Sequence, residues 1–170
     1  PEALYCLAEA RFEEAMEAYA AGEAQYDRAW DQWLRSDKAA EPKVPAPDLS
    51  RAAEAYRRVA EEFPQWRHAD AASYGLAFCL RSMLENERAA AELARMSRTW
   101  PASALASEGT FLLGEALFAS GKFREAADAF RSVLSKADSP HALAASYRLG
   151  WSLYRARDVP SAIRGMADLV

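Results

Sequence analysis

The chain has 170 residues, 51% of them apolar and 27% charged, and its formal net charge is −4 at pH 7. This length and apolar content are enough to bury a continuous core. The acidic balance, without a lysine- or arginine-rich tract, argues against nucleic acid as a partner. The apolar runs are far shorter than the roughly 20 residues that span a bilayer, so we also expect no membrane span.

The first predicted element is a helix over residues 3–35, because this stretch lacks proline and contains only one glycine, Gly22. Its apolar stripe has helical spacing and consists of Phe12, Met16, Tyr19, Tyr26, Trp30 and Trp33. We call Tyr26, Trp30 and Trp33 the distal stripe. It has two candidate covers: Val44, Pro45 and Leu49 of the following segment, or a partner protein or second copy of the chain.

A proline-rich linker is predicted over residues 36–47, since Pro42, Pro45 and Pro47 are incompatible with a helix interior. A second helix is predicted over residues 48–63. It ends before Pro64 because the residue that precedes a proline avoids the helical region. Three helical hairpins follow, over residues 68–100, 103–138 and 140–170. We therefore expect one all-α domain over residues 1–170.

A pattern of small and large residues repeats along these hairpins. Gly75, Gly114 and Gly150 recur at intervals of 39 and 36 residues in the predicted first helices. The predicted second helices each carry a small residue followed by a larger one: Ala52 and Tyr56, Ala89 and Leu93, Ala126 and Phe130, Ala162 and Met166. Small residues permit two helices to approach closely, so these positions are expected in the core. A period of this length indicates a stack of helical hairpins.

This pattern resembles the tetratricopeptide repeat (TPR) family. The resemblance implies a right-handed superhelix, an α-solenoid, of about four hairpins. The extended N-terminal helix departs from the family, because a first helix of a repeat is much shorter. It also implies a non-catalytic scaffold for protein–protein interaction. Segments 55–64 and 100–117 are similar to bacterial cell-envelope TPR proteins, namely the outer-membrane assembly lipoproteins and the periplasmic factor associated with the Tol–Pal system. That similarity implies a role in an envelope assembly in the periplasm, with the cytoplasm as the alternative.

In TPR arrays the first helices of successive hairpins line a concave groove. If each glycine is position eight of its repeat, positions five, nine and twelve face this groove. In the first helix Ala8 would take the place of the glycine. The expected groove residues are Tyr5, Glu9 and Phe12; Ala72, Leu76 and Cys79; Phe111, Glu115 and Phe118; and Tyr147, Trp151 and Tyr154. Exposed aromatic side chains on such a surface favour the binding of a protein segment, either a peptide or a helix. The alternative is that the N-terminal segment or a further repeat covers them.

The sequence offers little for catalysis. His68 and His141 lie far apart, each in a turn, without further ligands at metal-binding spacing. Cys6 and Cys79 are expected too far apart for a disulfide. We therefore expect no catalytic residue, no metal, no cofactor and no enzymatic activity.

A second hypothesis is a self-assembling structural segment. It would pair into a homo-oligomer through the long helix and an open terminal face that carries Ile163, Met166 and Leu169. That face also predicts that the chain is a fragment of a longer array, because solenoids usually end in a polar capping helix.

Overall fold

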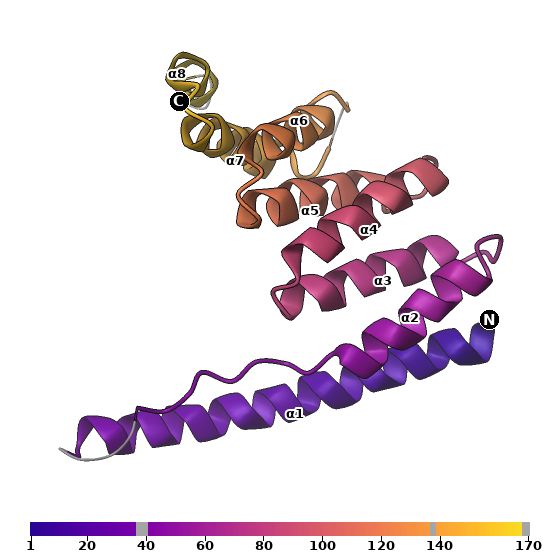
Figure 1. The fold of residues 1–170 in the computed structure, drawn as a ribbon, viewed down its shortest axis with the longest axis vertical. Coiled ribbons are helices and arrows are strands. Elements are labelled where there is room, and N and C mark those ends of the chain that lie inside the picture. Colours follow the sequence, from indigo (N-terminus) through magenta and orange to yellow (C-terminus); the bar gives the residue numbers. More distant parts are fainter. Residues whose placement is uncertain (37–40, 137–138, 168–170) are drawn as a thin grey trace.

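The computed structural model describes residues 1–36, 41–136 and 139–167. Within these ranges the chain is all-α, with helices that pack in chain order into four stacked hairpins (Figure 1). The helices are α1 (Glu2–Leu34), α2 (Ser50–Glu62), α3 (Ala69–Ser82), α4 (Asn86–Thr99), α5 (Ala106–Ala119), α6 (Phe123–Leu134), α7 (Ala142–Arg155) and α8 (Val159–Ala167). The predicted fold class, an all-α stack of hairpins with a long N-terminal helix, is therefore confirmed.

The turns inside the last three hairpins have one common geometry. Each contains a residue with positive φ: Leu84 at 63°, Gly121 at 76° and Arg157 at 67°. The next residue donates its backbone N–H to the first helix, as Lys122 does to the carbonyl of Leu117 at 2.9 Å. This is the hydrogen bond of a helix that ends in a left-handed residue. The three turns therefore fix a common numbering for the three repeats.

This numbering corrects the register predicted for the α3–α4 hairpin. Seven residues before each left-handed residue lie Ala77, Gly114 and Gly150. A Cβ atom on Gly114 would lie 2.6 Å from the ring of Phe130 in the facing helix, and Ala77 packs in a buried cluster with Leu93. Position eight of this repeat is thus Ala77, and the prediction of Gly75 is wrong by two residues.

Gly75 has a different neighbour. A Cβ atom on Gly75 would lie 2.9 Å from the ring of Tyr56, which belongs to α2 in the preceding hairpin. Its lack of a side chain therefore serves the contact between two hairpins and not the contact inside one. Both Gly75 and Ala77 are small, so the sequence pattern alone did not separate these two roles.

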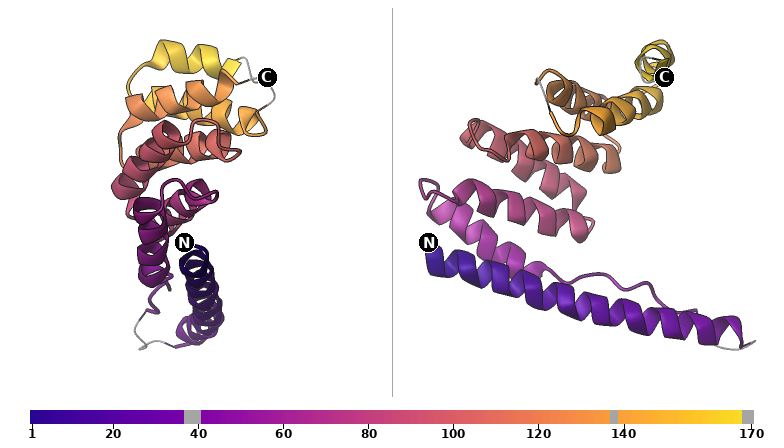
Figure 2. Two further views of the ribbon diagram at one scale, coloured as in Figure 1. Left: turned by 90° about the vertical axis from the view of Figure 1, so that its right-hand side faces the viewer. Right: turned by 180° about the vertical axis from the view of Figure 1, so that it is seen from behind.

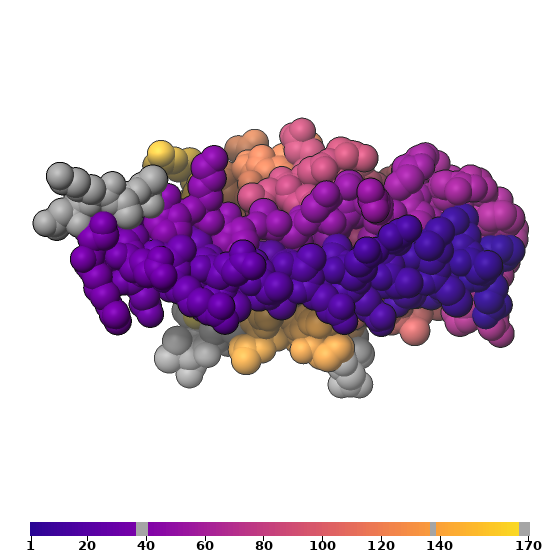
Figure 3. All heavy atoms as spheres, turned by 90° about the horizontal axis from the view of Figure 1, so that it is seen from below, coloured from indigo at the N-terminus to yellow at the C-terminus, as the bar shows by residue number. Residues whose placement is uncertain are grey.

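The N-terminal helix extends well beyond the hairpin that it forms with α2. Its first part buries Ala8, while Leu49, at the end of the linker, is buried in the same core. Residues 41–49 of the linker lie alongside α1 (Figures 1 and 2), and a Cβ atom on Gly22 would lie 3.6 Å from Cβ of Pro45. Viewed from below, α1 extends across one whole face of the molecule (Figure 3).

The linker residue Pro45 lies against Gly22, one turn before the distal stripe, and Leu49 is buried in the core with Ala8, so cover of the distal stripe by the linker stays a prediction. Pro45 is half-buried, but Val44 is 75% exposed and covers little, which corrects the expectation for that residue. Within the stripe, the ring of Trp30 lies 6.0 Å from that of Tyr26 and 5.0 Å from that of Trp33. All three side chains are half-buried, and the docking of a partner on them stays a prediction.

Candidate partner-binding surface

The corrected register defines one row of side chains on the first helices of the four hairpins. With Ala8, Ala77, Gly114 and Gly150 at position eight, we call positions five, nine and twelve the first-helix stripe. It consists of Tyr5, Glu9 and Phe12 on α1; Tyr74, Phe78 and Arg81 on α3; Phe111, Glu115 and Phe118 on α5; and Tyr147, Trp151 and Tyr154 on α7. The nine residues expected on α1, α5 and α7 remain in the stripe, and on α3 three other residues replace the three that were expected.

The residues expected on α3 lie in the core. Leu76 is only 5% exposed, and Ala72 and Cys79 are fully buried. Leu76 is therefore not a groove residue. The register predicted for α3 was wrong by two residues, so the residues that it selected face the interior. The evenly spaced turns at Leu84, Gly121 and Arg157 carried the signal that would have revealed Tyr74 and Phe78.

Contacts between successive repeats support the corrected stripe. The ring of Phe12 on α1 meets that of Phe78 on α3 at 5.8 Å. The phenol of Tyr74 donates a hydrogen bond of 2.7 Å to Glu108 on α5. Residues that the sequence places on separate helices therefore form one nearly continuous row.

A cavity of about 370 Å³ opens at the junction of α1 with α3. Its aromatic lining consists of Tyr5, Phe12, Tyr56, Tyr74 and Phe78, and its carboxylate is that of Glu9. We call it the N-terminal junction cavity. It combines a mainly aromatic wall with a few polar groups, which is the usual composition of a binding pocket.

The polar groups of this cavity are held by hydrogen bonds. Tyr56 donates its phenolic proton to Glu9 at 2.5 Å, and burial together with that bond raises the pKa of Tyr56 far above its usual value. Burial and the neighbouring Glu9 carboxylate raise the pKa of Tyr5 to about 12. Burial and the bond to Glu108 raise the pKa of Tyr74 in the same way. At neutral pH the phenols are therefore protonated and available as hydrogen-bond donors.

The equivalent junction of α5 with α7 contains a cation of its own. Arg148 binds Glu115 through two contacts, Nε to Oε1 at 2.7 Å and Nη2 to Oε2 at 2.8 Å. Its guanidinium carbon lies 5.7 Å from the ring centre of Phe118. Arg155 lies over the ring of Phe123 at 4.5 Å. A carboxylate and an aromatic ring together hold an arginine here, as expected for a charge-assisted pair with a cation–π contact.

On α7 the stripe is open to solvent. Tyr147 is 53% exposed, Trp151 39% and Tyr154 51%. The three rings contact one another edge to face, with centroid distances of 6.3 and 5.9 Å. Large adjacent aromatic side chains at a surface are typical of interaction sites. The distal stripe of α1 lies at the far end of that helix, apart from the first-helix stripe (Figure 1).

The two histidines occupy equivalent places and pack on aromatic rings. His68 precedes α3 and lies 6.3 Å from the ring of Tyr5, while His141 precedes α7 and stacks on Phe111 at 5.1 Å. Among the described residues, no three His, Cys, Asp or Glu side chains come together as metal ligands. Cys6 is exposed and Cys79 is buried, both as free thiols, and burial raises the pKa of Cys79 to about 12.

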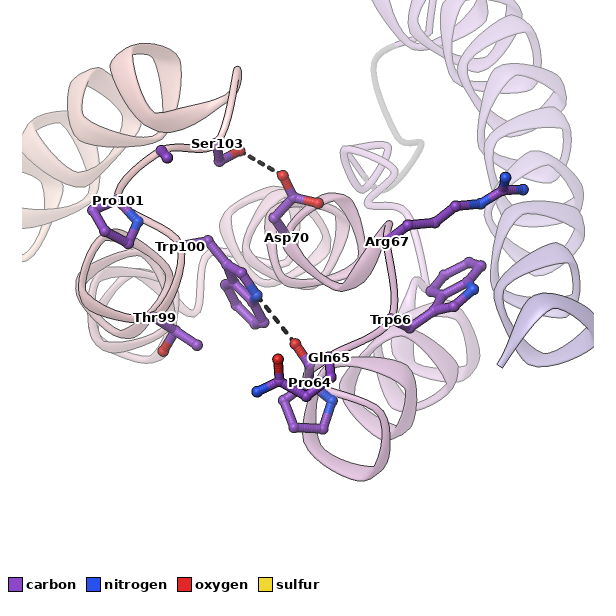
Figure 4. A pocket seen from close by; sticks show the side chains of 10 residues that line it. Pro64, Gln65, Trp66, Arg67, Asp70, Thr99, Trp100, Pro101 and Ser103 are labelled. Carbon is purple, nitrogen blue, oxygen red and sulfur yellow. Dashed lines mark hydrogen bonds between the residues drawn. The ribbon is translucent and has the colours of Figure 1, made fainter.

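A second cavity, of about 390 Å³, lies between the turns that precede α3 and α5 (Figure 4). Two hydrogen bonds connect residues that line it. The indole of Trp100 donates to the carbonyl of Pro64 at 3.2 Å, and Ser103 donates to Asp70 at 2.6 Å. These bonds join successive turns, so we interpret this cavity as part of the packing between hairpins.

Comparisons with known proteins agree with this arrangement. Residues 111–168 match a family model described as tetratricopeptide repeat. Among solved structures, the chain resembles a putative kinesin light chain with nearly identical TPR-like repeats from Podosopora anserina, at 13% identity and a TM-score of 0.57 over 98% of this chain and 94% of that one. A variant of the same protein gives 13% identity and 0.56 over 98% and 93%. No curated protein matches the chain. Among the described helices, none is both long and apolar enough to cross a membrane.

Proposed function

We propose that the chain is a non-catalytic scaffold that binds a segment of a partner protein along the first-helix stripe. In support, residues 111–168 match a tetratricopeptide repeat model, and the part of the chain that the structure describes folds as TPR-like hairpins. TPR repeats in general serve protein–protein interaction. The stripe passes over all four hairpins, so an extended peptide or a helix is the expected partner.

One observation carries this proposal: Tyr147, Trp151 and Tyr154 lie side by side on α7 and are all exposed. Apolar rings gain nothing from contact with water, whereas a partner that covers them releases their hydration. Aromatic anchors of this kind commonly contribute a large share of the free energy of binding at an interface.

A peptide selection tests the proposal. Peptides selected from a random displayed library on the intact chain are labelled, and their affinities are measured by fluorescence anisotropy. The triple variant Tyr147→Ala/Trp151→Ala/Tyr154→Ala should weaken binding by about 100-fold, since each anchor contributes of order 1 kcal/mol or more. Arg98→Ala, an exposed change on α4, is the matched control and should leave affinity unchanged. Equal affinity of the triple variant and the control would contradict the proposal.

We also propose that this scaffold acts in a bacterial envelope assembly. Its support is the similarity of segments 55–64 and 100–117 to envelope TPR proteins. Fractionation of cells that carry the natural gene tests it: recovery in the periplasmic or outer-membrane fraction supports an envelope role, and recovery with cytoplasmic markers contradicts it.

The alternative function, self-assembly, is favoured by a second apolar surface. Of the predicted terminal face, Ile163 is exposed, Met166 packs against Gly150 inside its own hairpin, and Leu169 lies outside the described residues. Leu143 and Val159 are also exposed on the last hairpin, and the aromatic distal stripe occupies the other end of the molecule. Light scattering over a range of concentrations should detect dimers or larger species, and Trp30→Ala/Trp33→Ala should reduce them. A mass that stays monomeric at every concentration would exclude this alternative.

A further inference from the structure

The N-terminal junction cavity has the same framework as the junction of α5 with α7. Glu9 and Phe12 occupy positions nine and twelve of the first repeat, as Glu115 and Phe118 do in the third. Tyr5 contacts Tyr56 at 5.9 Å, as Phe111 contacts Phe130 at 5.7 Å. A histidine at the equivalent position packs at the edge of each junction, His68 on Tyr5 and His141 on Phe111.

The two junctions differ at position six of the following repeat. In the C-terminal junction this position is Arg148, which binds Glu115 and lies over Phe118. In the N-terminal junction the equivalent residue is Gly75, two residues before Ala77. Gly75 has no side chain to reach Glu9; the ring of Tyr56 packs closely against it, and both residues line the cavity of about 370 Å³.

We propose that the N-terminal junction cavity binds the guanidinium of an arginine in the partner segment, which takes the place that Arg148 fills in the other junction. This inference rests on the proposed function, because it identifies the chemistry of one partner residue. Glu9 is exposed and can accept charge-assisted hydrogen bonds from the fork of the guanidinium, while Phe12 and Phe78 supply ring faces.

The surrounding charges favour a cation. Besides Glu9, the carboxylate of Glu108 accepts a hydrogen bond from Tyr74, which lines the cavity. Asp70 lies close enough to contribute to the raised pKa of Tyr5. The described residues that line the cavity include no lysine or arginine, and the nearby cation is Arg81 on α3, which partly opposes the rise in the pKa of Tyr74. A planar guanidinium fits a carboxylate beside aromatic rings better than an ammonium does.

The test uses the complete chain, labelled with ¹⁵N, and N-acetyl-L-arginine N-methylamide as the probe. Titration should move the amide signals of residues around Gly75, Phe78 and Phe12 saturably, with a dissociation constant on the order of millimolar for one side chain. The citrulline analogue has nearly the same shape without the charge and should bind at least about 10-fold more weakly. The lysine analogue should fall between the two.

Two variants locate the interaction. Glu9→Gln should weaken the arginine probe by about 10-fold because the acceptor loses its charge. Glu125→Gln, an exposed change on α6, is the matched control and should leave binding unchanged. Circular dichroism and the dispersion of amide signals show that both variants remain folded. Equal shifts with citrulline, an unaffected Glu9→Gln variant, or shifts confined to other acidic surfaces would overturn the inference.

The selected peptides separate this inference from the function on which it rests. If they bind the first-helix stripe but arginine is not required for their affinity, the arginine site is wrong and the scaffold function stands. If the triple α7 variant binds them as the wild type does, the scaffold function on this stripe is wrong. The small probe then still reports on the cavity alone.

Discussion

The junction of α1 with α3 and the junction of α5 with α7 have equivalent carboxylate and aromatic residues, but among the described residues only the second contains an arginine that binds the carboxylate. At the junction of α5 with α7, Arg148 joins Glu115 to the neighbouring hairpin, so the groups meet within the chain. At the junction of α1 with α3, Glu9 accepts a hydrogen bond from Tyr56 of its own hairpin, and Gly75, which has no side chain, lines a cavity. In a repeat array, therefore, one residue at an equivalent position can decide whether a junction is closed by packing or open to a ligand.

The comparison depends on the common register, and the largest expected effect tests that register. Gly114→Leu forces a side chain against the buried ring of Phe130 and should lower the free energy of unfolding by about 3 kcal/mol. Ala77→Leu should cost a similar amount, because Ala77 is the equivalent residue. Urea denaturation measures both changes.

Gly165→Leu is the control for this pair, since a Cβ atom at Gly165 meets nothing within 4 Å. It should change stability by less than about 1 kcal/mol. If Ala77→Leu is as mild as Gly165→Leu, the corrected register of the α3–α4 hairpin is wrong.

The next effect concerns the closed junction itself. Arg148→Ala removes the partner of Glu115, whose side chain is only 15% exposed, and should lower stability by about 1–2 kcal/mol. Arg131→Ala breaks the exposed pair with Asp128 and should cost at most about 0.5 kcal/mol. Thermal denaturation that gives the two variants equal losses would show that Arg148 adds nothing to the junction.

A smaller loss is expected at the open end of the stripe. Trp151→Ala should lower the free energy of unfolding by about 1 kcal/mol, because much of the ring is already in water. Phe130→Ala, in the fully buried core, should cost about 3 kcal/mol or more. If Trp151→Ala proves as damaging as Phe130→Ala in urea denaturation, Trp151 is a core residue and not a binding residue.

The smallest effect is a gain. Leu84 has a φ of 63° and is 80% exposed, so its backbone is strained while its side chain contributes little packing. Leu84→Gly should raise the free energy of unfolding by about 0.5 kcal/mol, since glycine adopts this conformation without penalty but is also freer in the unfolded chain.

Leu84→Ala is the control for that gain because it removes the same exposed side chain but keeps Cβ. It should bring no stabilisation. A gain of the same size in Leu84→Ala, measured by differential scanning calorimetry, would place the strain in the leucine side chain and not in the backbone.

The sequence by itself determined the elements and their order. The absence of proline before the linker predicted the long helix, which runs from Glu2 to Leu34 against the predicted 3–35. Pro64 marked a helix end, and the recurrence of small residues indicated stacked hairpins. Local sequence suffices for these features because helix formation and termination depend on residues close to one another along the chain.

Tertiary structure decided which side of each helix faces which neighbour. Gly75 and Ala77 are both small and lie two residues apart, so helical periodicity gave no means to choose between them. The choice follows from Phe130 and Leu93 in facing helices and from the left-handed turn residues, and it moved Leu76 from the groove to the core. Likewise, whether a carboxylate such as Glu9 or Glu115 has an arginine partner depends on a residue more than 30 positions away. Such contacts arise only when the hairpins stack, because the energy of side-chain packing is set by neighbours in space.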